Sequence, residues 1–221
     1  MERKLFNPKM EAIDPEDQRR LEQDLLVEQI RYVFDKSEMY QKKFKTAKMT
    51  GRDVNSVEDL ARLPFTTKRD LRESQKRNAP LGDFLPAPSD KICRIHRTSG
   101  TTGSFVYTAL TANDADLTHD CGARSFWAAG LRPRHRVVHC LNYCMWMGGY
   151  TDHANLEKTG ASVLPFGVGN SRLLVRVIKD AGITAISSTP SYPKYLEGAV
   201  REELGIEPSE LGLRLGLFGG E

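Results

Sequence analysis

Residues 97–105 read RTSGTTGSF, a stretch in which two glycines stand among five serine and threonine residues, with no proline and no acid. Such a composition is typical of a tight turn, because glycine reaches backbone angles closed to other residues and hydroxyls bond nearby amides. It also suits a phosphate-binding loop, in which glycines let backbone N–H groups approach an anion closely. The segments on either side must decide between the two.

Those segments favour a loop between two strands. KICRIH (residues 91–96) and FVYTAL (residues 105–110) both alternate in hydrophobicity as strands do. A Walker A loop needs Gly-Lys-Ser/Thr leading into a helix, and a dinucleotide fingerprint also needs a helix after its glycines. Here Ser104 and Phe105 lead into a strand instead. We therefore expect an anion to be held by backbone amides and by the hydroxyls of Thr98, Ser99, Thr101 and Thr102.

Helices and strands alternate along the rest of the chain. This order predicts an α/β fold with βαβ crossovers and a mostly parallel sheet covered on both faces. The expected helices cover residues 113–130, 147–160, 170–182 and 191–205, and the expected strands cover residues 136–142, 161–167, 183–190 and 213–221.

The first 90 residues have a different character. Helical spacing predicts a long helix over residues 15–35 and a shorter one over 37–45. Two further short helices are expected within 56–75, started by Ser56 and by Thr66 or Thr67 as caps. We expect a domain boundary in the loop of residues 78–90, between an N-terminal helical lobe (residues 1–90) and an α/β nucleotide-binding part (residues 91–221).

Composition narrows the class of protein. The 221 residues are 39% hydrophobic and 28% charged, which is typical of a folded globular protein. The net charge of +3 gives no case for nucleic-acid binding. No apolar run is long enough for a membrane span, and no secretory signal is apparent. Four cysteines are too few for a disulfide framework, so we expect a cytoplasmic protein.

The motifs, taken in order, resemble one family. TSGTTG (residues 98–103) resembles the phosphate-binding signature of adenylate-forming enzymes, the acyl-CoA synthetase and luciferase superfamily. LPFTTKRDLRE (63–73), RIHRTSGTTG (94–103), TPSY (189–192) and LRLGLFGGE (213–221) stand in the order found in the phenylacetate–CoA ligase family. The resemblance covers roughly residues 30–221 and implies the fold of that family's large N-terminal domain.

The resemblance also implies a reaction. An AMP-forming ligase of this family activates a carboxylic acid, with phenylacetate as the first guess for the aryl acid. The carboxylate attacks the α-phosphate of ATP, and the thiolate of CoA then displaces AMP. ATP, Mg²⁺ and CoA are thus the implied cofactors and substrates. Neutral donors from a Gly/Ser/Thr loop, with Mg²⁺, suit a step that brings two anions together.

The resemblance assigns the candidate site residues but no catalytic residue and no metal ligand. ATP phosphates are expected at Thr98, Ser99, Gly100, Thr101, Thr102 and Gly103; adenine at Gly219, Gly220 and Glu221; and the acid at Tyr143, Trp146, Met147, Gly148, Gly149, Thr189, Pro190 and Ser191. The family often has Lys-Pro after the last glycine of the loop, where this chain has Ser104 and Phe105.

Each assignment has a structural alternative. The aromatic stretch 143–147 could be core packing, and Gly219–Glu221 the end of a buried strand. Pro190 suits a first helical turn that Thr189 or Ser191 would cap. His96 could face phosphate, although a strand histidine is more often packed. His139, Cys140, Cys144 and His153 could suggest zinc, but their spacing does not fit a paired site.

The family's later motifs are not found in these 221 residues. They are a Tyr-x-x-Thr-Glu-like segment, a ribose-binding Asp and a late catalytic Lys. The chain resembles roughly the first half of such an enzyme, and we expect it to be inactive alone. Small-molecule partners are expected, a homodimer is an option, and no nucleic acid or membrane partner is indicated. Two other hypotheses are a non-catalytic nucleotide-binding or interaction module, and an adenylating enzyme that forms no thioester.

Overall fold

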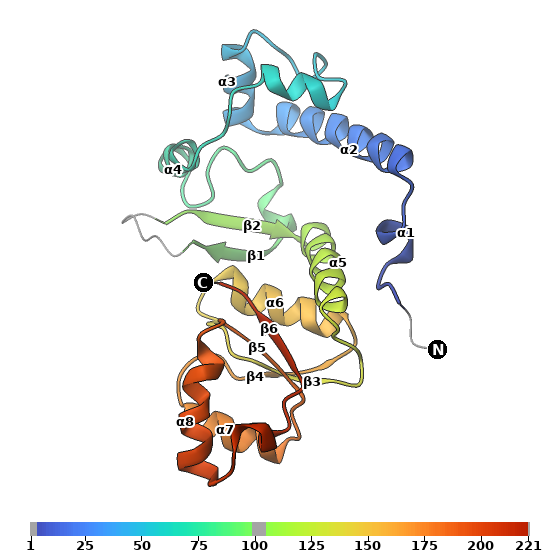
Figure 1. Ribbon diagram of the computed structural model, residues 1–221. Coiled ribbons are helices and arrows are strands. Elements are labelled where there is room, and N and C mark those ends of the chain that lie inside the picture. Colours follow the sequence, from blue (N-terminus) through green and yellow to red (C-terminus); the bar gives the residue numbers. More distant parts are fainter. Residues whose placement is uncertain (1–3, 99–104, 221) are drawn as a thin grey trace. The chain divides into compact units, whose positions relative to one another are not determined.

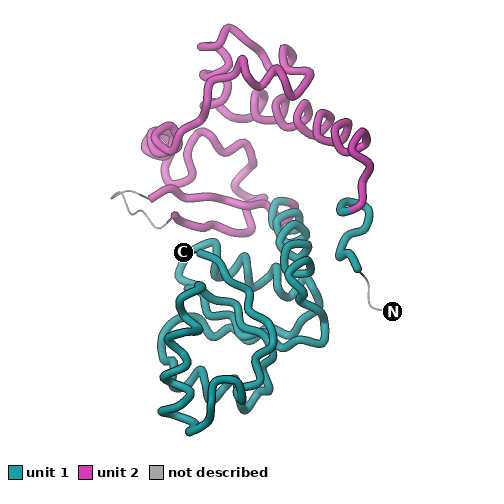
Figure 2. The backbone as a smooth tube through the Cα atoms, in the orientation of Figure 1, with its two compact units in different colours: residues 1–11, 114–221 teal, residues 12–113 magenta. Residues whose placement is uncertain are grey.

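The computed structural model describes residues 4–98 and 105–220. The backbone forms two compact units, one of residues 12–113 and one of residues 1–11 with 114–221 (Figure 2). The expected domain boundary after residue 90 concerns which segments fold independently, and it stays a prediction.

Four helices of the 12–113 unit begin at or within one residue of where the sequence predicts, whereas the short η2 was not predicted. Thr67 caps α4 by accepting a hydrogen bond from the backbone of Asp70, and the Asp70 carboxylate accepts one from the backbone of Thr67 in return. At the start of η1, the Asp59 carboxylate accepts a hydrogen bond from the backbone N–H of Ser56. The helical elements are α2 (Pro15–Lys36), α3 (Glu38–Thr46), η1 (Val57–Arg62), α4 (Lys68–Arg77) and η2 (Ser89–Lys91).

A buried carboxylate ties α4 to the loop that follows it. Asp83 accepts hydrogen bonds from Nε and Nη2 of Arg77 at 3.0 and 2.9 Å, and a very short one from the Ser74 hydroxyl. The Arg77 guanidinium is the first cause that lowers the pKa of Asp83 to about 2. This unit's small apolar core comprises Phe44, Met49 and Val54.

The two strands around residues 99–104 form a separate antiparallel hairpin. Strands β1 (Ile92–Arg97) and β2 (Tyr107–Thr111) pair with Arg97 opposite Tyr107. The loop therefore joins two strands, as predicted. The side-chain amide of Gln75 on α4 donates to the Tyr107 carbonyl at 2.8 Å and accepts from the Tyr107 N–H at 3.2 Å.

The other unit is built on a parallel sheet of four strands, in the order β4-β3-β5-β6. All three strand pairs are parallel, which confirms the α/β class. The strands are β3 (Arg136–His139), β4 (Ser162–Pro165), β5 (Ala185–Ser188) and β6 (Leu215–Phe218). The helices are α1 (Pro8–Glu11), α5 (Ala112–Ala128), α6 (Met147–Lys158), α7 (Ser171–Asp180), α8 (Tyr192–Leu204) and the short η3 (Pro208–Leu211).

Helices cover both faces of this sheet, as predicted (Figure 1). Successive strand residues point to opposite faces. Val137 and Ala185 therefore pack in one core with Leu156 of α6, whereas Val138 and Ile186 pack in the other with residues of α7 and α8. Because helices cover both faces, adjacent strand residues such as Val137 and Val138 are both buried and apolar rather than alternating.

The strands are shorter than predicted. The strand expected over residues 136–142 ends at His139, and the one expected over 183–190 ends at Ser188. In both places the chain turns at the edge of the sheet. Among the described residues, no helix combines the length and the apolar character that crossing a membrane requires.

Candidate functional site

The segments predicted to bind the acid and adenine follow the carboxyl ends of the parallel strands. β3, β5 and β6 end at His139, Ser188 and Phe218, and residues 140–149, 189–191 and 219–220 come next. Carboxyl ends of parallel strands lie at one edge of a sheet, which is where ligands of open α/β folds bind. The sheet therefore gathers these predicted segments at one edge.

Backbone hydrogen bonds continue past the strand ends and fix these segments. The Cys140 N–H donates to the Ser187 carbonyl at 2.8 Å, and the Gly219 N–H donates to the Ser188 carbonyl at 3.2 Å. The Gly167 N–H donates to the carbonyl of His139 at 3.0 Å. The turns at this edge are thus extensions of the ladder rather than free loops.

The indole of Trp146 lies beside two of the predicted glycines. A Cβ placed on Gly148 would stand 2.9 Å from Cζ3 of Trp146, and one placed on Gly220 would stand 3.5 Å from its Cη2. Gly220 has a φ of +88°, a conformation that favours glycine. The structure thus brings the turn predicted to bind the acid next to the segment predicted to bind adenine.

Gly149 differs from its neighbour Gly148. It is buried, and a Cβ placed on it would lie 2.2 Å from the carbonyl oxygen of Asn142 and 2.7 Å from Cα of Tyr143. A side chain here would meet backbone rather than open space. Gly149 lets the first turn of α6 approach the turn of residues 140–146 closely.

That turn exposes apolar side chains. Met145 has a φ of +58°, which is unusual for a residue with a side chain, and is 52% exposed, while Met147 is 37% exposed. The Trp146 N–H donates to the carbonyl of Cys144 at 2.7 Å, which tightens the turn.

Tyr143 is oriented by a histidine that sequence reasoning considered only for zinc. Its hydroxyl lies 2.9 Å from Nδ1 of His153, and Nε2 of His153 lies 3.2 Å from Glu157. Burial raises the pKa of Tyr143 to about 12, so the phenol stays protonated. In the sequence, the i, i+4 spacing of His153 and Glu157 within an expected helix could have indicated that these two side chains interact.

His139 is also placed for hydrogen bonding and not for metal. It is fully buried, with Nδ1 3.0 Å from the Ser187 hydroxyl and Nε2 2.9 Å from the Gly149 carbonyl. Burial lowers the pKa of His139 and raises that of the Cys140 thiol to about 12. Among the described residues no three His, Cys, Asp or Glu side chains are grouped to hold a metal ion. All four cysteines are free.

The segment after β5 forms a turn before its helix. Thr189 is half-buried, whereas Pro190 and Ser191 are exposed. The placement of Pro190 in the first helical turn is wrong: α8 begins at Tyr192, after a turn in which the Tyr192 N–H donates to the Thr189 carbonyl at 3.3 Å. Pro193 occupies the first helical turn, and Ser191 is the N-cap residue but makes no side-chain cap bond.

The predicted phosphate loop is described only at its base. Ser99, Gly100, Thr101, Thr102 and Gly103 lie outside the described residues, as does Glu221. The Thr98 N–H donates to the Val106 carbonyl at 3.0 Å, and the Val106 N–H donates to the Thr98 hydroxyl at 3.1 Å. His96 is 3% exposed, in agreement with a packed histidine.

Phe105, which follows the loop, packs against charge. The guanidinium carbon of Arg97 lies 3.8 Å from the centroid of its ring. This cation–π contact joins the two strands where they enter and leave the loop.

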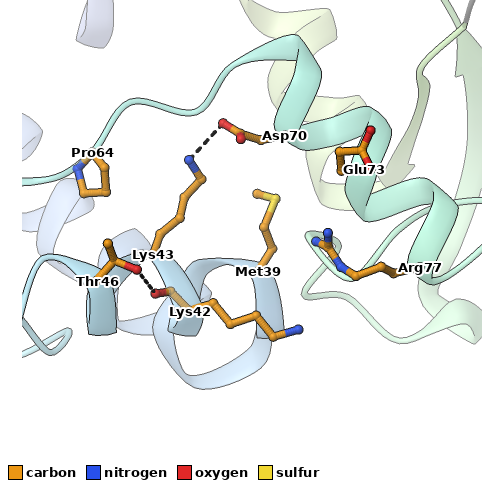
Figure 3. A pocket seen from close by; sticks show the side chains of 8 residues that line it. All are labelled: Met39, Lys42, Lys43, Thr46, Pro64, Asp70, Glu73 and Arg77. Carbon is orange, nitrogen blue, oxygen red and sulfur yellow. Dashed lines mark hydrogen bonds and ion pairs between the residues drawn. The ribbon is translucent and has the colours of Figure 1, made fainter.

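A cavity of about 440 Å³ lies elsewhere, between α3 and α4 (Figure 3). Its basic groups already have partners: Lys43 is 2.9 Å from the Asp70 carboxylate and donates to the Phe65 carbonyl at 2.7 Å, and Arg77 binds Asp83. Because these basic groups are already paired, the cavity is a poor candidate for an anion-binding site. It is lined by Met39, Lys42, Lys43, Thr46, Pro64, Asp70, Glu73 and Arg77.

Comparison with known proteins gives a consistent result. No protein-family model matches the chain. It is 34% identical over 220 residues to the phenylacetate–coenzyme A ligase of Pseudomonas putida, covering 100% of this chain and 48% of that protein. It is 32% identical over 217 residues to the phenylacetate–coenzyme A ligase of Thermus thermophilus, covering 98% of this chain and 47% of that protein.

A solved structure shares the fold. The chain superposes on 2-hydroxyisobutyryl-CoA ligase, crystallised with 2-HIB-AMP and CoA in the thioesterification state, with a TM-score of 0.91 and 30% identity over 99% of this chain and 46% of that one. An open conformation of the same ligase, in complex with 2-HIB-AMP and CoA, matches with a TM-score of 0.91 and 28% identity over 100% of this chain and 51% of that one. The chain thus spans about half the length of the relatives it matches.

Proposed function

The phenylacetate–coenzyme A ligases are the family to which this chain is homologous from end to end, and we propose that it forms the N-terminal, nucleotide- and acid-binding part of an AMP-forming acid–CoA ligase. The observation that carries the proposal is the sheet edge, where the indole of Trp146 lies next to Gly220, on the side where a Cβ would stand. An adenylation site needs the acid and the nucleotide side by side, and this proximity brings together the two segments proposed to hold them.

In the proposed first step, the acid's carboxylate attacks the α-phosphate of ATP, and pyrophosphate leaves. Residues 98–103 hold the phosphates through hydroxyls and, beyond Thr98, whose amide donates to Val106, through backbone amides; these groups neutralise charge without acting as nucleophiles. Gly219, Gly220 and Glu221 receive the adenine. In the second step CoA, as its thiolate, attacks the acyl carbon and AMP leaves. Mg²⁺ would lower the repulsion between the two anions, but the described residues offer no grouped ligands to which we assign it.

An aryl acid is the proposed substrate. Tyr143 and Trp146 present flat rings, and the exposed Met145 and Met147 present adaptable apolar side chains on the same turn. A planar ring fits such a wall better than a long acyl chain does. Thr189 and its neighbours add a further wall at the end of β5.

The four free cysteines favour the reducing cytoplasm as the site of action.

The proposal is tested with the full-length protein that contains these 221 residues. Carboxylate-dependent ATP–pyrophosphate exchange should occur with arylacetates or benzoates, and CoA-dependent AMP release should follow. Exchange without AMP release would indicate an adenylating enzyme that forms no thioester. Loss of both, with ATP still bound, would indicate a non-catalytic nucleotide-binding module.

The phosphate loop has its own test within this experiment. Thr101→Ala should slow pyrophosphate exchange by roughly 30- to 1,000-fold, as expected for a hydrogen-bond donor to developing charge worth about 2–4 kcal/mol. Binding of the acid should change little. Thr66→Ala, at an exposed threonine outside the loop, is the matched control. Equal exchange rates in the two variants would show that the loop is only a turn.

A further inference from the structure

We propose that His139 is a positioning residue for the acid pocket: its neutral imidazole holds the start of α6 and the end of β5 together and thereby sets the turn that carries Tyr143 and Trp146. This inference rests on the proposed function and deepens it.

The first step is the place of His139 in the sheet. It is the last residue of β3, an interior strand between β4 and β5, and it is 0% exposed. Its cross-strand neighbour on β5 is Ser187, which is also buried. A buried polar side chain at this position must be hydrogen-bonded, since burial without a partner forfeits its hydrogen bonds to water. Both ring nitrogens are in fact engaged.

The second step is the direction of these hydrogen bonds. The Gly149 carbonyl can only accept, so Nε2 of His139 carries the proton and donates to it over 2.9 Å. Nδ1 is then the acceptor, and the Ser187 hydroxyl donates to it over 3.0 Å. This fixes a single neutral tautomer, and burial, which lowers the pKa of His139, keeps the ring uncharged. His153 faces His139 at a ring distance of 6.3 Å and further disfavours a charge there.

The third step leads from the histidine to the pocket. Gly149, which His139 holds, lies directly against the backbone of Asn142 and Tyr143. The ring of His139 also meets the ring of Tyr143 edge-on, with centroids 5.5 Å apart and planes at 86°. A loss of the imidazole would therefore release two supports of the turn at once. His139 does not act as an acid, a base or a metal ligand, because both nitrogens are used within the protein.

The test compares histidines at the two ends of one strand in the full-length protein. His139→Leu removes both hydrogen bonds, and Ser187→Ala removes one partner. His139→Gln can restore a donor to the Gly149 carbonyl. His135→Gln is the matched control, because His135 precedes β3 at its amino end and accepts from the Arg132 N–H at 2.9 Å, away from the carboxyl edge.

We expect His139→Leu to raise the Michaelis constant for the acid at least tenfold with less than a threefold change in kcat. Ser187→Ala should shift it in the same direction, His139→Gln should recover part of the loss, and His135→Gln should stay within twofold of wild type. Should His139→Leu not fold, the glutamine and serine variants carry the comparison. An unchanged Michaelis constant in the folded His139 or Ser187 variants overturns the proposal, as does an equal change in His135→Gln.

A second readout needs no ligase activity. Amide hydrogen exchange of the unliganded protein should become faster over residues 140–150 in the His139 and Ser187 variants but not in His135→Gln. If no acid is activated by the wild type while this local change is seen, the proposed function fails and the positioning role stands. If exchange rises equally throughout the sheet, or not at all, His139 is an ordinary core residue.

Discussion

Replacing Gly149 by alanine tests whether the turn at the end of β3 is held by direct contact between backbones. The added Cβ would lie 2.2 Å from the Asn142 carbonyl oxygen, 2.7 Å from Cα of Tyr143 and 2.8 Å from the Asn142 carbonyl carbon. All three are backbone atoms, so no side-chain rotation relieves the clash. To reach an ordinary separation, the turn or the helix must move by about 1 Å.

The magnitude follows from two opposed terms. Overpacking of this kind costs about 1–3 kcal/mol. Alanine in place of glycine within a helix returns about 1 kcal/mol. The net loss of stability is therefore about 0–2 kcal/mol, a factor of up to roughly 30 in the folded-to-unfolded ratio. Displacement of the turn by about 1 Å should also lower kcat/KM for the acid by as much as 100-fold.

Urea unfolding and steady-state kinetics of the full-length protein measure both effects. Gly198→Ala is the control, because Gly198 lies within helix α8, where a Cβ added to it would meet no atom within 4 Å. That variant should gain about 0.5–1 kcal/mol from helix propensity alone. If Gly149→Ala gains stability as Gly198→Ala does and keeps wild-type kinetics, the backbone contact does not constrain the turn.

Three further predictions concern single side chains. Trp146→Ala should raise the Michaelis constants of both the acid and ATP, because the indole lies next to Gly220; a rise for the acid alone in steady-state kinetics would show that Trp146 serves only the acid pocket. Asp83→Asn should lower stability by about 2 kcal/mol near pH 6. Because the folded pKa of Asp83 is depressed to about 2, this difference should fade as the pH falls from about 4 to 2. Equal urea midpoints of the two proteins at pH 6 would contradict this prediction. Asp152→Asn should raise stability by about 1–2 kcal/mol at pH 7.5. Burial raises the folded pKa of Asp152 to about 6, so the gain should vanish as the pH falls toward 4. A gain that persists at pH 4 in urea unfolding would contradict a charge effect.

The sequence predicts the helices and strands well because their signals are local. The capping box at Thr67 and Asp70 and the alternation of elements after residue 110 need no tertiary knowledge. The expected ends of β3 and β5 lie two or three residues beyond the observed ones. After β5 the chain turns at Thr189 and Pro190, which are half-buried and exposed, whereas after β3 the apolar run continues into a turn that is itself buried. Cys140 and Leu141 are buried although they lie beyond β3, so hydrophobicity alone cannot mark the strand's end.

The candidate site was predictable in its segments but not in its contacts. Family motifs point to Trp146 and to Gly220, yet 74 positions separate them in the sequence and only the sheet order brings them together. His139 forms hydrogen bonds with Gly149 and Ser187, which lie on two other elements. A single histidine in an apolar strand carries no local sign of such partners.

The side chain of Gln75 has a consequence for the hairpin that no motif suggests. Its amide meets both the N–H and the carbonyl of Tyr107, and so occupies the backbone groups that a neighbouring strand would use. An open strand edge is a template for unwanted pairing with other chains, and proteins protect such edges. Gln75 thus satisfies the backbone groups of the first residue of β2, which an additional paired strand would otherwise satisfy. A leucine of similar size at position 75 should leave that edge open and make the protein more prone to self-association at high concentration.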